Sequence, residues 1–148
     1  MMIILRTFRE NDLQQVIALV KETFNEDYKP ETYLAFANTW RDGFLILEDN
    51  GKVVGMLVAT IPAYKEARIL IMAVKKGYRS LGLGSRMMNH FVSLCRSLGF
   101  TSIRLEVRES NMGAISFYNR HGFRIVGYIP CYYRDGEAGH IMQLILVS

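Results

Sequence analysis

The apolar residues near the N-terminus recur every three or four positions, a spacing that predicts two amphipathic helices. The first covers residues 13–24, where the opposite face carries glutamine, lysine and glutamate, and Asn11 or Asp12 is expected to cap it. The second begins at Pro30, a residue suited to the first turn of a helix, and Gly43 is expected to end it. Each helix would bury one face against the rest of the fold.

Shorter runs of apolar and β-branched residues predict the strands of a sheet. The expected strands are residues 3–7, 44–47, 52–61, 67–74, 102–107, 123–129 and 140–147. Asn50 and Gly51 stand between the second and third runs, and an Asn-Gly pair between apolar runs is a strong hairpin signal, so the sheet should begin antiparallel. The run at 67–74 is almost entirely apolar toward its end, which predicts a central strand covered on both faces.

Two further helices are predicted in the second half of the chain. One follows a basic, glycine-bearing loop at residues 75–84, and Gly99 is expected to cap its C-terminus. The other begins at Asn111 and continues to His121, where Gly122 closes it. Strands that alternate with helices, with an antiparallel beginning and end, predict an α/β or α+β fold whose mixed sheet carries helices on both faces.

The composition fits a single domain covering residues 1–148. The chain is 50% hydrophobic and 22% charged, which allows a buried core and argues against wholesale disorder. Its two cysteines, Cys95 and Cys131, could form at most one disulfide and lack the spacing of a zinc site, so a reducing compartment is expected. The apolar run at the N-terminus is too short for a signal peptide or a membrane span, which predicts a cytoplasmic protein.

The net charge of +4 favours an anionic partner, and the loop at residues 78–84 is the place where an anion would bind. There a strand leads into a helix N-terminus, Gly82 and Gly84 permit close backbone approach, and Arg79 supplies a forked cation, so the loop suits a pyrophosphate. The alternative, a turn that needs its glycines only for its backbone angles, stays open. The P-loop motif fails because no Lys-Ser/Thr pair follows Gly82, and the dinucleotide fingerprint fails because Met87 replaces its third glycine.

Two blocks of sequence carry a resemblance to a known family. Residues 79–84 read RSLGLG, which resembles the acetyl-CoA pyrophosphate loop of the GNAT superfamily of N-acetyltransferases. From Leu105 the chain reads LEVRESNMGAISFYNRHGF, followed by GY, YY and DGE, which is similar to the ribosomal-protein-alanine (RimI-type) branch and its N-terminal acetyltransferase relatives. The resemblance is close over residues 72–143. It implies a mostly antiparallel sheet of about seven strands, about four helices, and splayed central strands that hold acetyl-CoA.

The resemblance implies acetyl-CoA as cosubstrate and no metal. In the family the loop N–H groups hold the CoA phosphates, the strand before the loop runs beside the pantetheine arm, and a backbone N–H near Val74 would stabilise the oxyanion. The resemblance adds an amide contact from Asn111 to the pantetheine arm, although Asn111 is also a favoured helix cap and both roles could hold; Ala114 would leave room for the arm, with simple packing as the alternative. The implied cofactor-binding residues are Met72, Ala73, Val74, Tyr78, Arg79, Ser80, Leu81, Gly82, Leu83, Gly84, Ser85, Asn111, Ala114, Phe117 and Tyr118.

Two residues are candidates for the chemical step. Tyr118 would act as the general acid, because a phenol with a pKa of about 10 stays protonated at neutral pH and can donate to the leaving thiolate. Glu106 lies in the middle of an apolar strand, where a carboxylate is costly unless it meets an arginine or opens into a site. The resemblance makes Glu106 a candidate general base that acts through water.

The acceptor implied by the resemblance is a protein N-terminal α-amine, framed by Tyr132 and Tyr133. The partners expected are acetyl-CoA and a peptide or protein N-terminus, with a ribosomal protein as one candidate, and neither nucleic acid nor a membrane; monomer and homodimer both remain open. Alternatives are a lysine or small-molecule amine as acceptor, a non-catalytic acetyl-CoA-binding module, and an RNA-contacting module that only the net charge would support.

Overall fold

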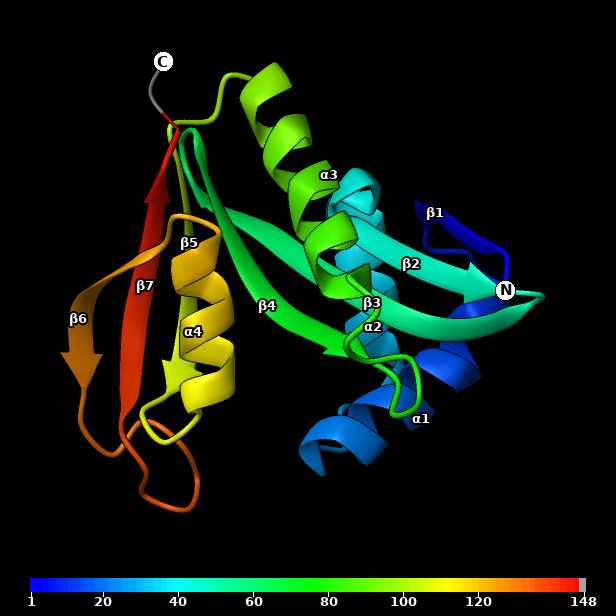
Figure 1. The fold of residues 1–148 in the computed structure, drawn as a ribbon, viewed down its shortest axis with the longest axis horizontal. Coiled ribbons are helices and arrows are strands. Elements are labelled where there is room, and N and C mark those ends of the chain that lie inside the picture. Colours follow the sequence, from blue (N-terminus) through cyan, green and yellow to red (C-terminus); the bar gives the residue numbers. More distant parts are fainter. Residues whose placement is uncertain (147–148) are drawn as a thin grey trace. The chain divides into compact units, whose positions relative to one another are not determined.

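The computed structural model describes residues 1–146, and within them seven strands form one mixed sheet accompanied by four α-helices (Figure 1). The strands are β1 (Ile3–Thr7), β2 (Phe44–Asp49), β3 (Lys52–Ala63), β4 (Glu66–Val74), β5 (Ser102–Arg108), β6 (Arg124–Ile129) and β7 (Gly139–Ile145). The helices are α1 (Leu13–Phe24), α2 (Pro30–Thr39), α3 (Leu83–Ser97) and α4 (Met112–Arg120). No helix among these residues is long and apolar enough to cross a bilayer.

The sheet order is β1-β2-β3-β4-β5-β7-β6. The pairs β1/β2, β2/β3, β5/β7 and β6/β7 are antiparallel, whereas β4 pairs with β5 in parallel. The predicted fold class, a mixed and mostly antiparallel sheet of seven strands with four helices, is therefore confirmed. The parallel ladder is short: it runs only from Glu66 opposite Ser102 to Arg68 opposite Arg104.

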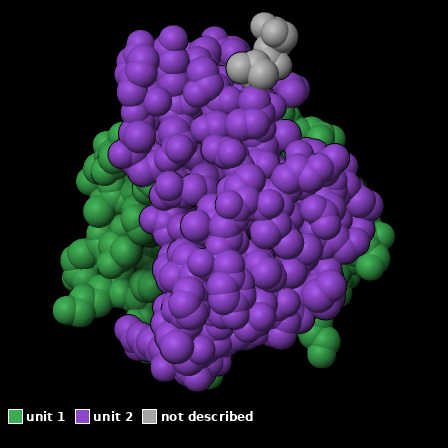
Figure 2. Space-filling view, turned by 90° about the vertical axis from the view of Figure 1, so that its left-hand side faces the viewer, with its two compact units in different colours: residues 1–60, 69–93 green, residues 61–68, 94–148 purple. Residues whose placement is uncertain are grey.

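The chain folds into two compact units, each made of two segments (Figure 2). Unit 1 comprises residues 1–60 and 69–93, and unit 2 comprises residues 61–68 and 94–148, of which 147 and 148 are not described.

Unit 1 contains a core of apolar side chains from α1, α2, β2 and β3. Val16 and Val20 of α1 are fully buried in it, as the three- and four-residue spacing predicts, and the rings of Phe8 and Phe44 stack at 4.3 Å. On β3, a Cβ built on Gly55 would lie 3.4 Å from the Met87 side chain of α3, so strand and helix approach closely there.

Unit 2 contains β5, β6 and β7 together with α4, which lies in front of β5 in Figure 1. Leu105 and Val107 of β5 are buried, and the residues between and beside them are charged, so the strand has one apolar and one charged face. Both cysteines are free thiols; Cys95 is buried, which raises its pKa to about 12, and Cys131 is exposed.

Most predicted boundaries agree with the structure to within two residues. Asn50 and Gly51 both have positive φ, as a two-residue hairpin turn of type I′ requires. Gly99 adopts φ +78° and the amide of Phe100 donates to the Cys95 carbonyl, which is the predicted glycine cap of α3. The last strand ends at Ile145, and the predicted strand end at Val147 lies outside the described residues.

The predicted cap of α1 is wrong in its chemistry. Asp12 occupies the N-cap position, but its side chain makes no capping bond to α1. Its carboxylate accepts two hydrogen bonds of 2.8 Å from the Arg6 guanidinium and another of 2.8 Å from the backbone N–H of Arg9. The carboxylate is buried, and an arginine partner compensates that burial better than a single amide would.

Two further expectations need correction. The second helix ends at Thr39, and a separate 3-10 turn, Arg41–Gly43, follows it; glycine is required at 43 because a Cβ there would collide with the Trp40 ring. Strand β4 is central, but its residues alternate between buried and half-buried, so only one of its faces is fully covered.

Candidate functional site

The loop from Tyr78 to Gly82 joins the end of β4 to the start of α3 within unit 1. Ser80 and Gly82 adopt left-handed φ angles of +67° and +77°, and nothing lies within 4 Å of a Cβ built on Gly82. Glycine at 82 is thus needed for its backbone angle, and the space beside it is open.

Two side chains fix this loop to the strands around it. Arg79 donates from Nε to the carbonyl oxygen of Val74 at 2.9 Å, which closes the loop onto the last residue of β4. The Tyr78 hydroxyl donates to Oδ2 of Asp49 at 2.7 Å, and this bond raises the pKa of Tyr78 above its usual value. The loop is held at both its strand end and the β2–β3 hairpin.

The start of α3 has the features of an anion site. Its first intrahelical bond runs from the Arg86 N–H to the Gly82 carbonyl, so the backbone N–H groups of the first turn point toward the loop. These dipoles favour negative charge, and phosphate groups bind at such helix ends. Leu81 is exposed, whereas Leu83 is buried and fixes the first turn of the helix. The loop therefore fits the predicted pyrophosphate ligand.

The remaining predicted cofactor residues of unit 1 lie along β4 and the first turn of α3. The Ala73 side chain is buried, while Met72 and Val74 are half-buried. Gly84 and Ser85 belong to α3 and are half-buried. Lys75, next in sequence, pairs with Glu22 of α1 at 3.2 Å.

In unit 2, Glu106 projects from the charged face of β5 and meets an arginine. Nη2 of Arg68 lies 2.6 Å from Oε1 of Glu106, and Nε lies 3.3 Å from Oε2. The same guanidinium donates from Nη2 to the Tyr132 hydroxyl at 3.1 Å. Glu106 and Tyr132, two predicted site residues 26 positions apart, are thereby joined through Arg68.

The two predicted acceptor tyrosines pack together. The rings of Tyr132 and Tyr133 meet edge to face at 5.0 Å, and the Arg108 guanidinium lies 4.1 Å from the Tyr133 ring centre. Arg108 also pairs with Asp135 at 2.9 Å and with Glu137 at 2.8 Å. The backbone N–H of Ser110 donates to Glu137 at 3.0 Å, which, together with Arg108, lowers the pKa of that carboxyl. These contacts fasten the loop before β7 to the end of β5.

Helix α4 carries the other predicted residues of unit 2. The Asn111 Oδ1 accepts from the Ala114 N–H at 3.2 Å, so the amide caps the helix as a favoured N-cap residue does. Phe117 and Tyr118 are half-buried and their rings lie 5.4 Å apart. Burial and, after it, the neighbouring phenol of Tyr133 raise the pKa of Tyr118 to about 12. The phenol is consequently protonated throughout the physiological pH range.

Within unit 2 the structure joins Glu106 and Tyr132 through Arg68, and it packs the Tyr118 ring near the rings of Phe117 and Phe123. Two participants were missed from the sequence, Arg68 and Arg108. Arg68 stands between Ala67 and Ile69 in an otherwise apolar run, and a charge in such a position signals a buried partner. That signal marks Arg68 as a side chain in need of a partner, but it does not identify Glu106 as that partner.

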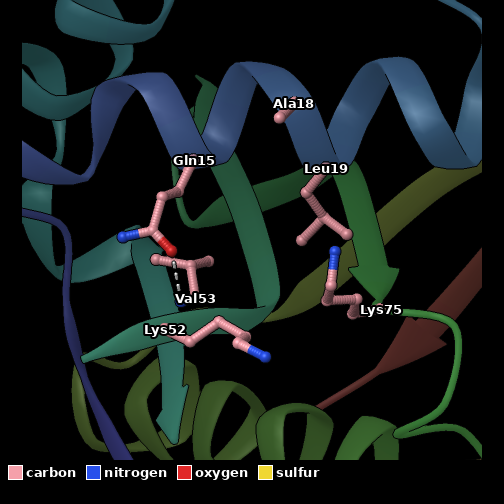
Figure 3. Close-up of a pocket in the computed structure, with 6 residues that line it drawn as sticks. All are labelled: Gln15, Ala18, Leu19, Lys52, Val53 and Lys75. Atoms are coloured by element: carbon pink, nitrogen blue, oxygen red, sulfur yellow. Dashed lines mark hydrogen bonds between the residues drawn. The ribbon is translucent and has the colours of Figure 1, made fainter. Parts of the chain in front are cut away.

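A separate pocket of about 350 Å³ lies beside α1 in unit 1 (Figure 3). Gln15, Ala18 and Leu19 line it from the helix, and Lys52, Val53 and Lys75 complete it. The Gln15 side chain accepts from the Val53 N–H at 2.9 Å. No predicted site residue contributes to this pocket. Among residues 1–146, no group of three or more His, Cys, Asp or Glu side chains could hold a metal ion.

Comparison with known proteins identifies the family. The sequence profile of the acetyltransferase (GNAT) family matches residues 13–123. An uncharacterized N-acetyltransferase of Methanocaldococcus jannaschii is 33% identical, over 94% of this chain and 89% of its own. The N-alpha-acetyltransferase daf-31 of Caenorhabditis elegans is 32% identical, over 94% of this chain and 80% of its own. The crystal structure of Ard1 from Thermoplasma volcanium superposes with a TM-score of 0.94 at 35% identity, covering 99% of both chains.

Two further structures bear on the branch within the family. The ribosomal-protein-S18-alanine N-acetyltransferase from Escherichia coli has a TM-score of 0.86 at 25% identity, over 99% of this chain and 96% of its own. Arabidopsis thaliana Naa50, solved with the bisubstrate analogue CoA-Ac-MVNAL, also has a TM-score of 0.86 at 25% identity, over 95% and 97% of the two chains. RimI-type and other N-alpha-acetyltransferases are thus both similar to this chain. The chain belongs to the acetyltransferase (GNAT) family and is an acetyl-CoA-dependent N-acetyltransferase.

Proposed function

We propose that this enzyme transfers the acetyl group of acetyl-CoA to the N-terminal α-amine of a protein. The observation that carries the proposal is Tyr118, a phenol whose pKa burial raises to about 12, in the unit that also contains Glu106 and Tyr132. Relatives named as N-alpha-acetyltransferases, one of them holding a peptide joined to CoA, support the choice of acceptor. As a single catalytic domain, residues 1–148 would act in the cytoplasm without metal, nucleic acid or membrane.

Acetyl-CoA would be bound through its pyrophosphate by the loop of unit 1. Backbone N–H groups at 79–84 would hold the pyrophosphate, with Arg79 adding positive charge, and β4 would run beside the pantetheine arm. The open space beside Gly82 and the N-terminus of α3 support this arrangement. Asn111 caps its helix through Oδ1, which leaves the amide nitrogen as the group that would contact the cofactor.

The transfer begins with attack by the neutral amine on the thioester carbonyl carbon. As the new C–N bond forms and the C–S bond breaks, Tyr118 gives its hydroxyl proton to the departing sulfur. The proton lost by the amine passes through a water to Glu106 and from there restores the Tyr118 phenol. An α-amine needs little help to lose its proton, because its pKa is about 7.7 to 8.0 against about 10.4 for lysine. The N–H near Val74 would stabilise the oxyanion.

The acceptor substrate would be a protein N-terminus that enters beside Tyr132 and Tyr133. A ribosomal protein that begins with alanine is the acceptor expected from the RimI-type resemblance, whereas the names of the other relatives specify an α-amine but no first residue.

A panel of peptides distinguishes these acceptors. Peptides with identical tails and different first residues, alanine, serine and methionine among them, are incubated with enzyme and isotope-labelled acetyl-CoA. Mass spectrometry then locates the label. Fast labelling of the alanine peptide alone supports the RimI-type acceptor, and labelling of several first residues supports a broader N-terminal enzyme. Label on lysine side chains or small amines only would contradict the proposal.

A further inference from the structure

Arg68 occupies a particular position in the sheet. It is the last residue of β4 in the parallel ladder, opposite Arg104, and Glu106 lies two residues further along β5. The Arg68 side chain therefore extends beyond its own rung of the ladder to reach Glu106. The Arg68 side chain is 29% exposed, whereas the Glu106 side chain is only 10% exposed.

The Arg68 guanidinium makes contacts in two directions. Nη2 and Nε hold the two carboxylate oxygens of Glu106, at 2.6 and 3.3 Å, and Nη2 also reaches the Tyr132 hydroxyl at 3.1 Å. A guanidinium can do this because its donors are fixed in one plane, whereas a lysine ammonium is a single point of charge. A buried carboxylate without such a partner would be strongly unfavourable.

The neighbouring charges on β5 already have partners of their own. Arg104 pairs with Glu66 at 3.6 Å, and Arg108 pairs with Asp135 and Glu137. Arg68 is therefore not exchangeable with either arginine, because each is held by different carboxylates. Of these three arginines, Arg68 is the one that contacts both Glu106, the candidate general base, and Tyr132, a tyrosine predicted to frame the substrate amine.

We propose that Arg68 is a positioning residue for acetyl transfer. It holds the Glu106 carboxylate and the Tyr132 hydroxyl in one fixed arrangement, so that the candidate base keeps a constant position relative to the tyrosine that would frame the acceptor amine. The inference rests on the proposed function in that it assigns Glu106 and Tyr132 to the acceptor side of the reaction. It predicts that disturbing Arg68 affects the acceptor amine and leaves acetyl-CoA binding unchanged.

The test compares Arg68→Lys with the matched control Arg104→Met, which removes an arginine–glutamate pair from the same two strands. Kinetics are measured with whichever amine the wild-type enzyme acetylates fastest, so Arg68 is tested even if that amine is not an N-terminus. We expect Arg68→Lys to raise KM for the acceptor about tenfold and to leave KM for acetyl-CoA unchanged, since a hydrogen bond to a charged group is lost. Arg104→Met should change neither.

A double-mutant cycle separates positioning from general destabilisation. Tyr132→Phe should raise KM for the acceptor in the wild type and have little further effect in Arg68→Lys, because the bond it removes is already lost. Melting temperatures identify any variant that fails to fold. If Arg68→Lys does not fold, Tyr132→Phe carries the test, since it removes only the hydroxyl that Arg68 contacts and should still raise KM for the acceptor. Additive effects of the two substitutions, or an Arg68→Lys enzyme that behaves like Arg104→Met, would overturn the inference. The proposed function is tested separately, by which amine the wild-type enzyme acetylates.

Discussion

The backbone of Gly139 lies directly against the ring of Tyr133. A Cβ built on Gly139 would be 3.3 Å from Cε2 of Tyr133 and 3.2 Å from Cδ2 of Tyr132, closer than most real Cβ contacts. Gly139 begins β7 and pairs with Arg108 of β5 and with Ile129 of β6, so its backbone is held on both sides. The two tyrosine rings therefore rest on a rigid strand end that has no room for a side chain.

Replacing Gly139 by alanine should displace both rings. Because the strand cannot move, we expect Gly139→Ala to raise KM for the acceptor peptide several-fold while KM for acetyl-CoA stays the same. Gly127→Ala is the matched control, since its Cβ would be equally crowded, at 3.0 Å from Ile141, but away from the tyrosines. Steady-state kinetics with each substrate varied in turn measures both constants. Equal effects of the two substitutions on the peptide would refute the role of Gly139.

Removing the Tyr118 hydroxyl should slow the chemical step. Burial raises the pKa of this phenol to about 12, so the group is protonated throughout the physiological pH range. Tyr118→Phe keeps the ring contacts with Phe117 and Phe123 but has no proton to give. We expect kcat to fall about a hundredfold or more, with KM for acetyl-CoA nearly unchanged. A variant with wild-type turnover would remove Tyr118 as the acid.

Gly82→Ala should weaken acetyl-CoA binding. Its φ of +77° costs an alanine about 1 to 2 kcal/mol, and relief of that strain would turn the loop amides away from their present directions. Gly51→Ala in the β2–β3 hairpin has a similar φ of +82° and serves as the control for lost stability. We expect both variants to melt at lower temperature and only Gly82→Ala to raise Kd for CoA in calorimetry. Unchanged affinity in Gly82→Ala would argue against phosphate binding at this loop.

The contacts of Asp135 and Glu137 should make the loop before β7 sensitive to acid. A hydrogen bond from the Glu137 N–H and the pairing with Arg108 lower the pKa of Asp135 below its usual 3.8, and the Ser110 N–H and Arg108 lower the pKa of Glu137 below its usual 4.5. Because the pKa of each carboxyl is lower in the folded state than in the unfolded state, these contacts stabilise the fold fully at a pH above the unfolded-state pKa. That stabilisation is lost as the pH falls through the folded-state pKa.

The amide protons of Ser110 and Glu137 report these titrations by NMR, because each donates to one of the two carboxylates. We expect the Ser110 amide to shift with a midpoint below pH 4.5 and the Glu137 amide with a midpoint below pH 3.8. Arg108→Met should move both midpoints upward. Midpoints at the ordinary values in the wild type would contradict the observed pairing.

Local chemistry made much of the fold predictable. Asn50-Gly51, Gly99 and Asn111 each require a particular backbone conformation within a few residues of themselves, and all three were identified correctly. Asp12 was misjudged as the cap of α1 because its partner, Arg6, is presented by a different element. The Asp12 carboxylate binds the charged Arg6 guanidinium, which is a stronger donor than a backbone amide.

The candidate site also has residues that the sequence predicts and a residue that depends on long-range pairing. Tyr118 and Glu106 lie in the stretch of sequence that resembles the GNAT family. The burial that raises the pKa of Tyr118 could be anticipated from the apolar face of its helix. The partner of Glu106 could not be chosen from the sequence, because the choice depends on β4 lying next to β5 in a short parallel ladder. Arg68 becomes the partner only through that long-range pairing.

The central claim is that the acetyl group goes to an N-terminal α-amine. Two peptides of one sequence, each with a single internal lysine, test it most directly: one has a free N-terminus and the other has its N-terminus blocked by a formyl group. After incubation with labelled acetyl-CoA, fragmentation by mass spectrometry should place the label on the α-amine of the first peptide and leave the second unlabelled. Label on the lysine of both peptides at equal rates would contradict the account.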